Sequence, residues 1–387
     1  MIAPQPFYTE RGTPMNIKTM CQILCDANHH IDLLTFPTGK DVLQKNLKII
    51  RVPNILRTKT IPIGLSFIKL FYDILIAIMA LWLLINNKYD VVHGIEEGGY
   101  LAVVLNKLFR KNSIFDMDSS IPEHLEDSGL IKNRFLIAAL SGIEKWCLKN
   151  SSLVITVCEA LSDKVRQMDP MATIFQIEDI PLSNQTQKSK ARISDVNKLY
   201  NLENFFRVVY TGNLEAYQGI DLLINAWKIF LKSTIDFNQY KLVLVGGNED
   251  KIEYYKKIAN SLGIQDSICW VGQRPSDEMD EWMSIAHVLV SPRSEGDNTP
   301  LKLYSYMSSG KPIVATRRRT HTQILDDSLA FLAKSTPIEF AKAISDALDN
   351  FEMALQKANE AKRIVETKYN YRTFERKLLK AYAQLTP

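Results

Sequence analysis

The 387-residue chain is too long for a single ordinary hydrophobic core, so two domains are expected. Its residues are 46% apolar and 23% charged, as in globular proteins, and a net charge of +4 does not indicate a nucleic-acid partner. The five cysteines are scattered and lack metal-ligand spacing, which favours reduced thiols in a cytoplasmic protein over a metal site. No cofactor is expected.

Residues 1–4 lack the basic start and apolar segment of a signal peptide and have the pattern of the end of a buried first strand. Further buried strands are predicted at residues 90–93, 113–115 and 153–157, each followed by a polar loop and a helical pattern. The longest apolar run, residues 74–85, has twelve residues, fewer than the roughly 20 that span a bilayer. No transmembrane helix is therefore expected.

A polar stretch at residues 183–201 interrupts this alternation and is predicted to be an interdomain linker. Alternation then restarts with five strands that each end in a turn, predicted at residues 207–211, 241–245, 267–271, 287–290 and 312–315. Strands that alternate with helices indicate parallel α/β architecture. Because ligands of open α/β sheets bind at the carboxyl ends of the strands, we expect the functional residues in these turns.

The most informative of these turns opens the segment 291–312. Thr299 can cap a helix whose first residue is Pro300, and Gly310 is placed to end it. A helix N-terminus at the carboxyl end of a strand is suited to bind a diphosphate, and Arg293 and Lys302 would add positive charge. The alternative is a capped surface helix with solvated charges.

Two other phosphate-binding motifs are excluded. Ser309-Gly310-Lys311 is similar to the end of a P-loop, but Ser305 and Pro312 stand where that motif needs a glycine and a hydroxyl residue. The G-x-G-x-x-G pattern of dinucleotide-binding enzymes does not occur.

The sequence resembles the retaining glycosyltransferases of family four, which have the GT-B fold. The similarity rests on residues 210–214, 245–247, 271–272, 291–293, 302–304 and 311–316, with weaker likeness at 90–93, 116–119 and 371–385. The resemblance implies an α/β chain of two Rossmann-like domains facing each other across a cleft. We expect an N-terminal, acceptor-side domain over residues 1–182, a C-terminal, donor-binding domain over 202–366, and a last helix within 367–387 that packs back on the first domain.

The resemblance also implies a function. Such an enzyme moves a sugar from a UDP- or GDP-linked donor to a glycan or a lipid-linked acceptor, with retention of anomeric configuration and without a metal. The leaving diphosphate would take the acceptor's proton in a front-face displacement. A role in cell-surface polysaccharide or glycolipid synthesis is expected for this family. Two alternatives remain open: an inactive donor-binding relative, and a GT-B sugar-nucleotide epimerase.

By the same resemblance, Glu295 is the carboxylate that contacts the transferred sugar, while Ser305 stands where the family has a second glutamate for the ribose. Asn213 and Gln218 stand where the family has a cationic pair for the diphosphate. We expect this clamp to be supplied by Arg293, Lys302 or the run Arg317–Arg319. The remaining donor-binding residues expected from the motifs are Gly212, Gly272, Arg274, Gly296, Asn298, Thr299 and Leu301.

In the first domain, Asp118 stands where the family commonly has a catalytic histidine, and its carboxylate could stabilise charge on the sugar ring. The alternative is that Asp118 only caps the next helix. On the acceptor side, His93 and Glu96 either line the cleft or belong to the core. Arg11 and Gly12 replace the glycine-rich first loop of the family, and Arg11 could meet an anionic acceptor.

The segment between residues 40 and 69 contains seven basic residues and one acidic residue, Asp41. It leads into an apolar helix around residues 67–85. A basic segment joined to such a helix suits peripheral contact with an anionic membrane surface. The alternative is a buried helix beneath a solvated loop. We expect a cytoplasmic enzyme, peripheral on the inner face of the membrane.

Overall fold

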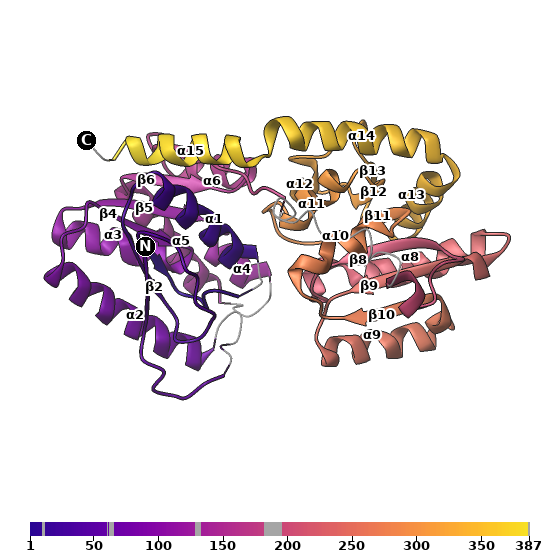
Figure 1. Ribbon diagram of the computed structural model, residues 1–387, viewed down its shortest axis with the longest axis horizontal. Coiled ribbons are helices and arrows are strands. Elements are labelled where there is room, and N and C mark those ends of the chain that lie inside the picture. The colour runs from indigo at the N-terminus through magenta and orange to yellow at the C-terminus, as the bar shows by residue number, and fades with distance from the viewer. Residues whose placement is uncertain (10–11, 60, 62–65, 128–132, 182–195, 386–387) are drawn as a thin grey trace. The chain divides into compact units, whose positions relative to one another are not determined.

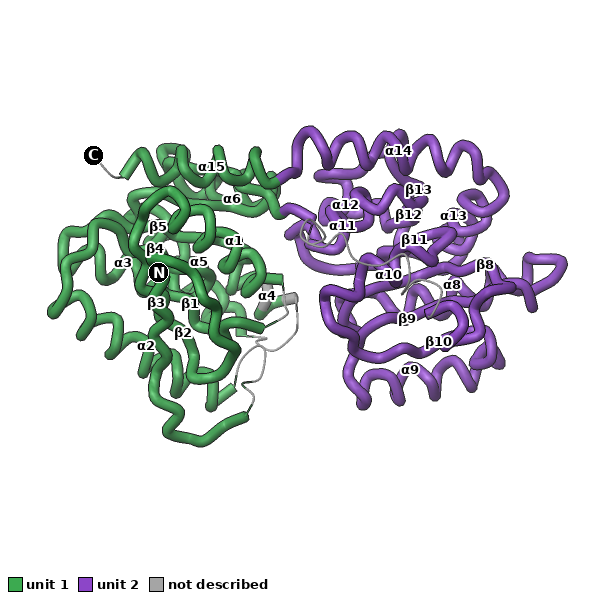
Figure 2. The backbone as a smooth tube through the Cα atoms, viewed as in Figure 1, with its two compact units in different colours: residues 1–179, 371–387 green, residues 180–370 purple. Residues whose placement is uncertain are grey.

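The computed structural model describes residues 1–9, 12–59, 61, 66–127, 133–181 and 196–385. The chain divides into two compact units, unit 1 of residues Met1–Asp179 with Tyr371–Pro387, and unit 2 of residues Ile180–Asn370 (Figure 2). Residues 183–195 of the expected linker lie outside the described residues. The C-terminal residues from 371 onward belong to unit 1.

Unit 1 contains a seven-stranded parallel sheet in the order β3-β2-β1-β4-β5-β6-β7 (Figure 1). Its central strands are continuous apolar runs, as expected where helices cover both faces of a sheet. All four residues of β6 are buried, for example. The strands are β1 (Ile2–Ala3), β2 (Ile31–Thr35), β3 (Leu47–Arg51), β4 (Val91–Ile95), β5 (Asn112–Met117), β6 (Leu153–Thr156) and β7 (Ile174–Gln176).

Helices connect these strands, and the last helix of the chain packs on α1 and β7. The helices of unit 1 are α1 (Gly12–Asp26), α2 (Phe67–Asn86), α3 (Glu97–Phe109), α4 (Ile121–Asp127), α5 (Arg134–Asn150), α6 (Glu159–Met168) and α15 (Tyr371–Ala383). Tyr382 of α15 is buried in the unit, where its hydroxyl lies 2.7 Å from His93 Nδ1.

Unit 2 contains a six-stranded parallel sheet in the order β10-β9-β8-β11-β12-β13, with a hydrophobic core on each face. The strands are β8 (Phe206–Thr211), β9 (Tyr240–Val245), β10 (Ile268–Gly272), β11 (Val288–Ser291), β12 (Ile313–Thr316) and β13 (Phe331–Ala333). The helices are α8 (Ile220–Ser233), α9 (Glu249–Ser261), α10 (Met279–Ser284), α11 (Leu301–Ser309), α12 (Arg319–Thr322), α13 (Pro337–Asp349) and α14 (Phe351–Lys368), and a 3₁₀ turn, η1 (Ala216–Gln218), precedes α8.

The five strands predicted in the second half are confirmed to within one residue at each end. Strands β2, β3, β7 and β13 were not predicted. Strands β7 and β13 have only three residues each, and β3 has no fully buried residue, whereas β2 is mostly buried. The helix predicted around residues 67–85 is confirmed as α2. Its 20 residues exceed the twelve-residue apolar run, so by length and composition it could span a membrane, although 22% of its apolar 18-residue window is buried within the unit.

Candidate functional site

The donor-loop segment, which we define as residues 292–300, leaves the carboxyl end of β11 and leads into α11. The predicted cap is wrong by one residue: Pro300, with extended backbone angles of φ −65° and ψ 125°, precedes the first residue of α11, and no side chain caps the helix. Thr299 is buried, and its Oγ1 accepts a hydrogen bond of 3.3 Å from Gln323. The prediction that Gly310 ends this helix is confirmed, since it adopts the left-handed conformation with φ 68°.

Lys302 lies in the first turn of α11 and reaches the loop after β8. Its Nζ donates a hydrogen bond of 3.0 Å to Gln218 Oε1 and lies 4.0 Å from the centre of the Tyr210 ring. A Cβ placed on Gly212 would come within 3.5 Å of this nitrogen. Burial, together with the nearby charge of Arg293, holds the pKa of Lys302 well below its usual range. An amine in this setting gains stability when an anion restores its charge.

Arg293 is 8% exposed and is held by the donor loop itself. Its Nε donates to the carbonyl oxygen of Glu295 at 2.8 Å, and one terminal nitrogen donates to Asn298 Oδ1 at 2.6 Å. The guanidinium also lies 5.3 Å from the centre of the Tyr217 ring. The two cations predicted from the sequence therefore contact the same turn at residues 216–218, Arg293 through Tyr217 and Lys302 through Gln218.

The loop after β8 and the donor loop approach each other closely because of Gly219. This residue follows η1 with φ 73°, and a Cβ on it would lie 2.1 Å from the Pro292 carbonyl oxygen. Any larger residue would push the two loops apart. The contact brings Gln218, the residue at the family's cationic position, within reach of Lys302. The Lys302 ammonium thus lies 3.0 Å from the side chain of Gln218, a residue 84 positions earlier in the chain.

His321, which the sequence patterns did not indicate, is hydrogen-bonded to residues next to the donor loop. It is fully buried at the start of the segment after β12, with Nε2 2.9 Å from Ser291 Oγ and Nδ1 2.9 Å from Thr316 Oγ1. Thr316 Oγ1 in turn donates to the Arg293 carbonyl oxygen at 2.5 Å. Burial lowers the pKa of His321 to about 3, so the ring is neutral. Its position after the basic run Arg317–Arg319 did not predict that it would be buried next to the donor loop.

Other predicted donor residues line the neighbouring strand ends. Asn213 is exposed, and its carbonyl oxygen accepts a 2.6 Å bond from the Tyr210 hydroxyl. Gly272 ends β10 with φ 77°, and its carbonyl oxygen accepts from Gly246 at 2.7 Å. Arg274 is paired with Glu278 at 2.8 Å, so this cation already has an acidic partner.

Four predicted residues of the donor loop and α11 differ in exposure. Glu295 is exposed, as a sugar contact would need. Gly296, with φ 82°, passes close over the Arg293 side chain, since a Cβ there would lie 2.6 Å from a guanidinium nitrogen. Ser305 is buried in the middle of α11, and Leu301 packs partly on a hydrophobic core.

The run Arg317–Arg319 was a third possible source of the clamp. Arg317 makes two hydrogen bonds to the Asp327 carboxylate, at 2.5 and 3.0 Å, and both side chains are exposed. Arg318 precedes the first residue of α12 and is exposed, whereas Arg319 begins that helix. Of this run, Arg317 is thus already paired with an acid at the surface.

In unit 1, carboxyl groups gather where β4 and β5 end. The pKa of Asp118 is raised well above its usual range by burial and by the charges of Asp116 and Asp179, while a hydrogen bond from Thr13 opposes this shift. Burial and Asp118 likewise raise the pKa of Glu96. Asp118 Oδ1 is buried and has no hydrogen-bond partner among the described residues. The alternative that Asp118 only caps a helix lacks support, since α4 starts three residues later.

Glu96 adopts φ 50° and ψ −119°, a conformation that strains a residue with a side chain. The half-buried residue directly precedes α3. A strained backbone next to a cluster of buried carboxyls is a feature of functional sites. Asp179, which contributes to the cluster and whose pKa is raised to about 7 by burial, was missed because it follows no predicted strand.

His93 is a core histidine, which corrects its assignment to the acceptor side. It is 1% exposed, with Nε2 3.2 Å from Asp116 Oδ2 and Nδ1 2.7 Å from the Tyr382 hydroxyl. Burial lowers its pKa to about 3. Gly12 is the exposed first residue of α1, and Arg11 lies outside the described residues. Among the side chains that the structure describes, no three of His, Cys, Asp or Glu are placed to hold a metal ion.

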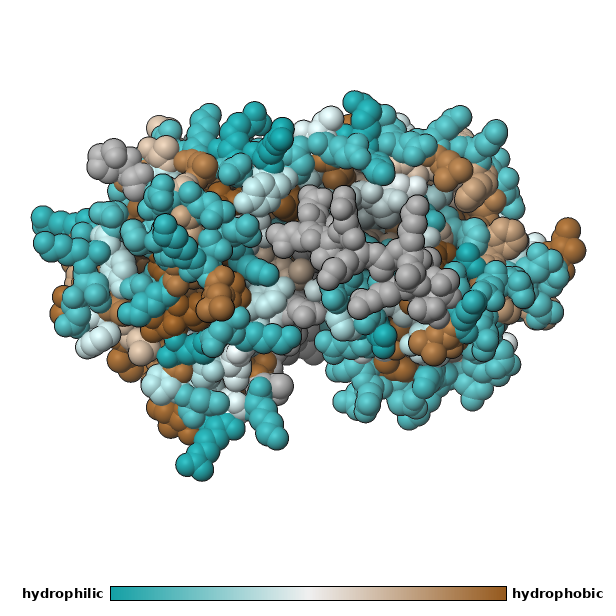
Figure 3. Space-filling model, viewed as in Figure 1, coloured by the Kyte–Doolittle hydropathy of each residue, from teal (hydrophilic) through white to brown (hydrophobic). Residues whose placement is uncertain are grey.

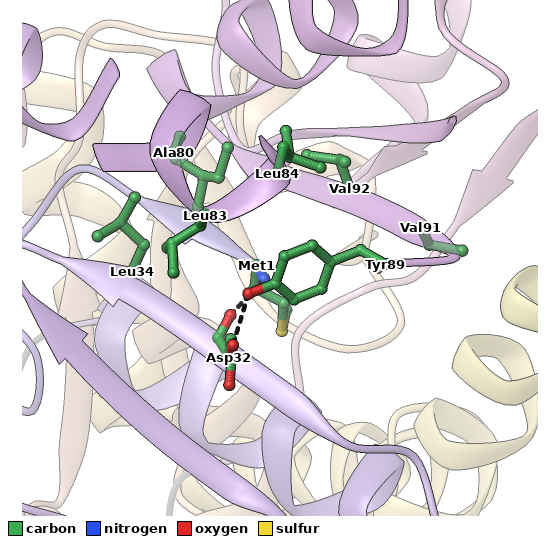
Figure 4. Close-up of a pocket in the computed structure, with 10 residues that line it drawn as sticks. Met1, Asp32, Leu34, Ala80, Leu83, Leu84, Tyr89, Val91 and Val92 are labelled. Atoms are coloured by element: carbon green, nitrogen blue, oxygen red, sulfur yellow. Dashed lines mark hydrogen bonds between the residues drawn. The ribbon is translucent and has the colours of Figure 1, made fainter. Parts of the chain in front are cut away.

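A pocket beneath α2 lies apart from these residues within unit 1 (Figure 4). It has a volume of about 40 Å³ and apolar walls that include Leu34, Leu83 and Val92. The Tyr89 hydroxyl donates to Asp32 Oδ2 at 2.6 Å across it. This volume suits a water molecule and is too small for a nucleotide-sugar.

Comparisons with known proteins show which proteins the chain is similar to. The family model described as "Glycosyl transferases group 1" matches residues 192–364. A curated relative from Haemophilus influenzae, described as an uncharacterized glycosyltransferase, is 30% identical over 173 residues, which are 44% of this chain and 47% of the relative. The chain thus spans about half the length of this relative.

Solved structures show the same fold over the whole chain. Sucrose-phosphate synthase from Thermosynechococcus elongatus matches with a TM-score of 0.78 and 17% identity, covering 99% of this chain and 98% of that chain. Anabaena HepE in complex with UDP matches with a TM-score of 0.74 and 15% identity, covering 98% of each chain. Residues 192–364 thus match the family model of the group 1 glycosyl transferases, and the chain has the GT-B fold.

Proposed function

We propose that the protein is a retaining glycosyltransferase that moves a sugar from a UDP- or GDP-linked donor to a glycan or a lipid-linked acceptor. The observation that carries the proposal is the pair of cations, Lys302 and Arg293, at the carboxyl ends of β8 and β11 in a group 1 glycosyl transferase domain. The pKa of Lys302 is lowered in the absence of an anion, and a bound diphosphate would favour its charged form. HepE, which shares the fold, was solved in complex with UDP, and this supports a nucleotide donor.

In the proposed reaction, the bond between the anomeric carbon and the diphosphate oxygen breaks while a bond from the acceptor hydroxyl forms on the same face of the sugar. The acceptor's proton passes to the leaving diphosphate. Lys302, Arg293 and the N-terminal backbone amides of α11 neutralise the charge that develops on that group. Glu295 contacts the transferred sugar and orients it.

The acceptor is proposed to bind to unit 1, near the carboxyl groups at the ends of β4 and β5. Asp118 supports this assignment because one of its oxygens is buried without a partner among the described residues. A carboxyl group whose pKa is raised can donate a hydrogen bond as well as accept one. Asp118 and Glu96 would position hydroxyl groups of the acceptor or of the donor sugar.

A second candidate function is donor binding without turnover. It is favoured by Ser305, which replaces a family carboxylate and is 7% exposed within α11, and by the uncharged Gln218. The third alternative, a sugar-nucleotide epimerase, needs acid and base groups such as the carboxyl cluster of unit 1.

A panel of nucleotide-sugars separates the three functions. A transferase releases UDP or GDP, faster with an acceptor, and NMR of the product reports the retained anomeric configuration. An epimerase forms a new sugar nucleotide without an acceptor, whereas an inactive relative binds a donor and converts none. Failure of calorimetry to detect binding of any nucleoside diphosphate would contradict the donor site itself.

A further inference from the structure

Helix α2 is apolar on two opposite faces. Tyr72, Ile76, Ala80 and Leu83 are buried in a core cluster that also contains residues of β2 and β4. On the other side, six large hydrophobic side chains each expose more than half of their surface: Phe67, Leu70, Ile74, Ile78, Trp82 and Ile85. At 100° per residue, these six fall within an arc of about 120°. A surface helix of a water-exposed domain normally carries polar residues on this arc.

The apolar surface continues on the neighbouring helices. Helix α2 contacts α3, and α3 contacts α5, so the three helices form one layer of unit 1. Leu108 of α3 is 66% exposed, and Phe135 and Trp146 of α5 are 89% and 46% exposed. Figure 3 shows hydrophobic surface on unit 1 where Figure 1 places α2. We call the outer side of α2, α3 and α5 the apolar layer face.

The charged residues that are exposed on these three helices are all basic. Over the fully described helices α2, α3 and α5, no exposed residue is acidic, because Asp73 and Glu97 are half-buried and Glu144 is buried. The exposed charged residues of the three helices are Lys107, Arg134, Lys145 and Lys149. A second copy of the chain would therefore place like charges against each other across the face.

The basic segment between residues 40 and 69 contributes less than its sequence predicts. Arg51 is bonded to Asp41 at 2.6 Å, and Lys69 is paired with Glu97. Arg57, however, is exposed in a loop that Tyr72 ties to α2, since the Tyr72 hydroxyl donates to Asn54 Oδ1 at 2.8 Å. Ile55, Arg57 and Lys59 of this loop are exposed, and the loop is tied to α2 through Tyr72 on the buried face of the helix.

We propose that the apolar layer face docks on an anionic lipid bilayer, with α2 lying in the plane of the interface. An apolar stripe flanked by basic and no acidic side chains is the pattern that such surfaces bind. Although α2 is long enough to cross a bilayer, Tyr72 and Ile76 hold its inner face in the core of unit 1, so the helix lies along the membrane. The inference concerns unit 1 and does not depend on the proposed transfer reaction.

Co-sedimentation of the full chain with vesicles tests this proposal. We expect binding to mixed phosphatidylcholine–phosphatidylglycerol vesicles, weakened by salt, and release by alkaline carbonate. Ile78→Glu should weaken binding about tenfold or more, because it removes an inserted apolar side chain and adds a repelled charge. Ile235→Glu is the matched control: Ile235 is fully exposed in unit 2, and its substitution should leave binding unchanged.

A second pair of variants tests the charges. Lys145→Glu with Lys149→Glu should weaken binding to anionic vesicles and leave the little binding to pure phosphatidylcholine unchanged, whereas Lys232→Glu in unit 2 should have no effect. The proposal is overturned if the wild-type chain stays in the supernatant with anionic vesicles at low salt, or if Ile78→Glu and Ile235→Glu bind equally. It is also overturned if the chain dimerises and Ile78→Glu only dissociates the dimer.

Discussion

The residues at the carboxyl ends of the strands are acidic in unit 1 and basic in unit 2. In unit 1, β4 and β5 are followed by Glu96 and Asp118, whose pKa values burial raises. In unit 2, the first turn of α11, beside the loop after β8, contains Lys302, whose pKa burial lowers. Burial disfavours the charged form in each case, so it favours the protonated form of the acids and the neutral form of the lysine. The two edges are therefore suited to different ligands: hydroxyl groups in unit 1 and an anion in unit 2.

Each unit also contains a buried neutral histidine, and the two have different neighbours. His93 lies between Tyr382 and Asp116 in the core of unit 1, while His321 joins Ser291 and Thr316 beneath the donor loop. His93 thus contacts Asp116, whose charge raises the pKa of Asp118, whereas His321 connects to the donor loop through the bond from Thr316 to the Arg293 carbonyl. Five changes test this contrast between an acidic and a basic edge.

The largest expected effect is that of His321→Ala. The substitution leaves a cavity and deprives two buried hydroxyl groups of their partner, so we expect a loss of about 3–4 kcal/mol in unfolding free energy. Urea denaturation measures this loss. The exposed His30→Ala should cost less than about 0.5 kcal/mol. Equal effects of the two substitutions would show that the donor loop does not depend on His321.

Lys302→Ala and Arg293→Ala should each weaken binding of a nucleoside diphosphate, with Lys302 the larger effect. Loss of one charged hydrogen bond costs about 1.5–3 kcal/mol, or roughly tenfold to a hundredfold in affinity. Calorimetry with UDP and GDP measures the change. Arg317→Ala is the control, because Arg317 is paired with Asp327 at the surface. Unchanged affinity in both test variants would remove these residues from the clamp.

Glu295→Gln should lower the turnover rate by about tenfold to a hundredfold and leave diphosphate affinity nearly unchanged. The reason is that the exposed carboxylate is assigned to the transferred sugar. Steady-state rates with the preferred donor, together with calorimetry, separate the two quantities. An equal loss of nucleoside-diphosphate binding would show that Glu295 contacts another part of the donor.

The affinity for a nucleoside diphosphate should fall as the pH rises. The pKa of Lys302 is lowered in the free protein, and a bound anion raises it, so binding takes up a proton in the pH range between the two values. The slope should not exceed about tenfold per pH unit. Lys302→Met removes this contribution while the titration of the nucleotide itself remains. Parallel pH profiles of the two proteins would contradict the shifted lysine.

The smallest expected effect concerns the acidic edge. Burial raises the pKa of Asp179 to about 7 from 3.8, so the folded chain binds the proton more tightly and loses stability as the pH rises between these values. In the Asp179→Asn variant, the loss of unfolding free energy between about pH 4 and about pH 7 should be smaller by about 1–2 kcal/mol. Urea denaturation at both ends of the range measures it. A loss of stability as large as that of the wild type would indicate that Asp179 is solvated.

Sequence patterns predicted the α/β class and most central strands, because continuous apolar runs in parallel sheets are local signals. Gly310 was predicted correctly for the same reason, since a helix end needs a left-handed residue at that position. Thr299 was assigned wrongly as the cap, because its hydroxyl serves Gln323 in the folded chain and Pro300 takes the position before α11. The strands β3 and β7 carried too few fully buried residues to be recognised.

The residue types of the candidate site were determined by the sequence: two cations and a glutamate in the donor loop and α11, and an acid after β5. Their partners were decided only by the tertiary structure. The contact of Lys302 with Gln218 spans 84 residues, and the bond of His93 to Tyr382 spans 289, separations at which no periodicity or local propensity carries information. The same holds for α2, whose apolar sequence fits a core as well as a surface. Which of its faces is buried depends on the sheet against which it packs.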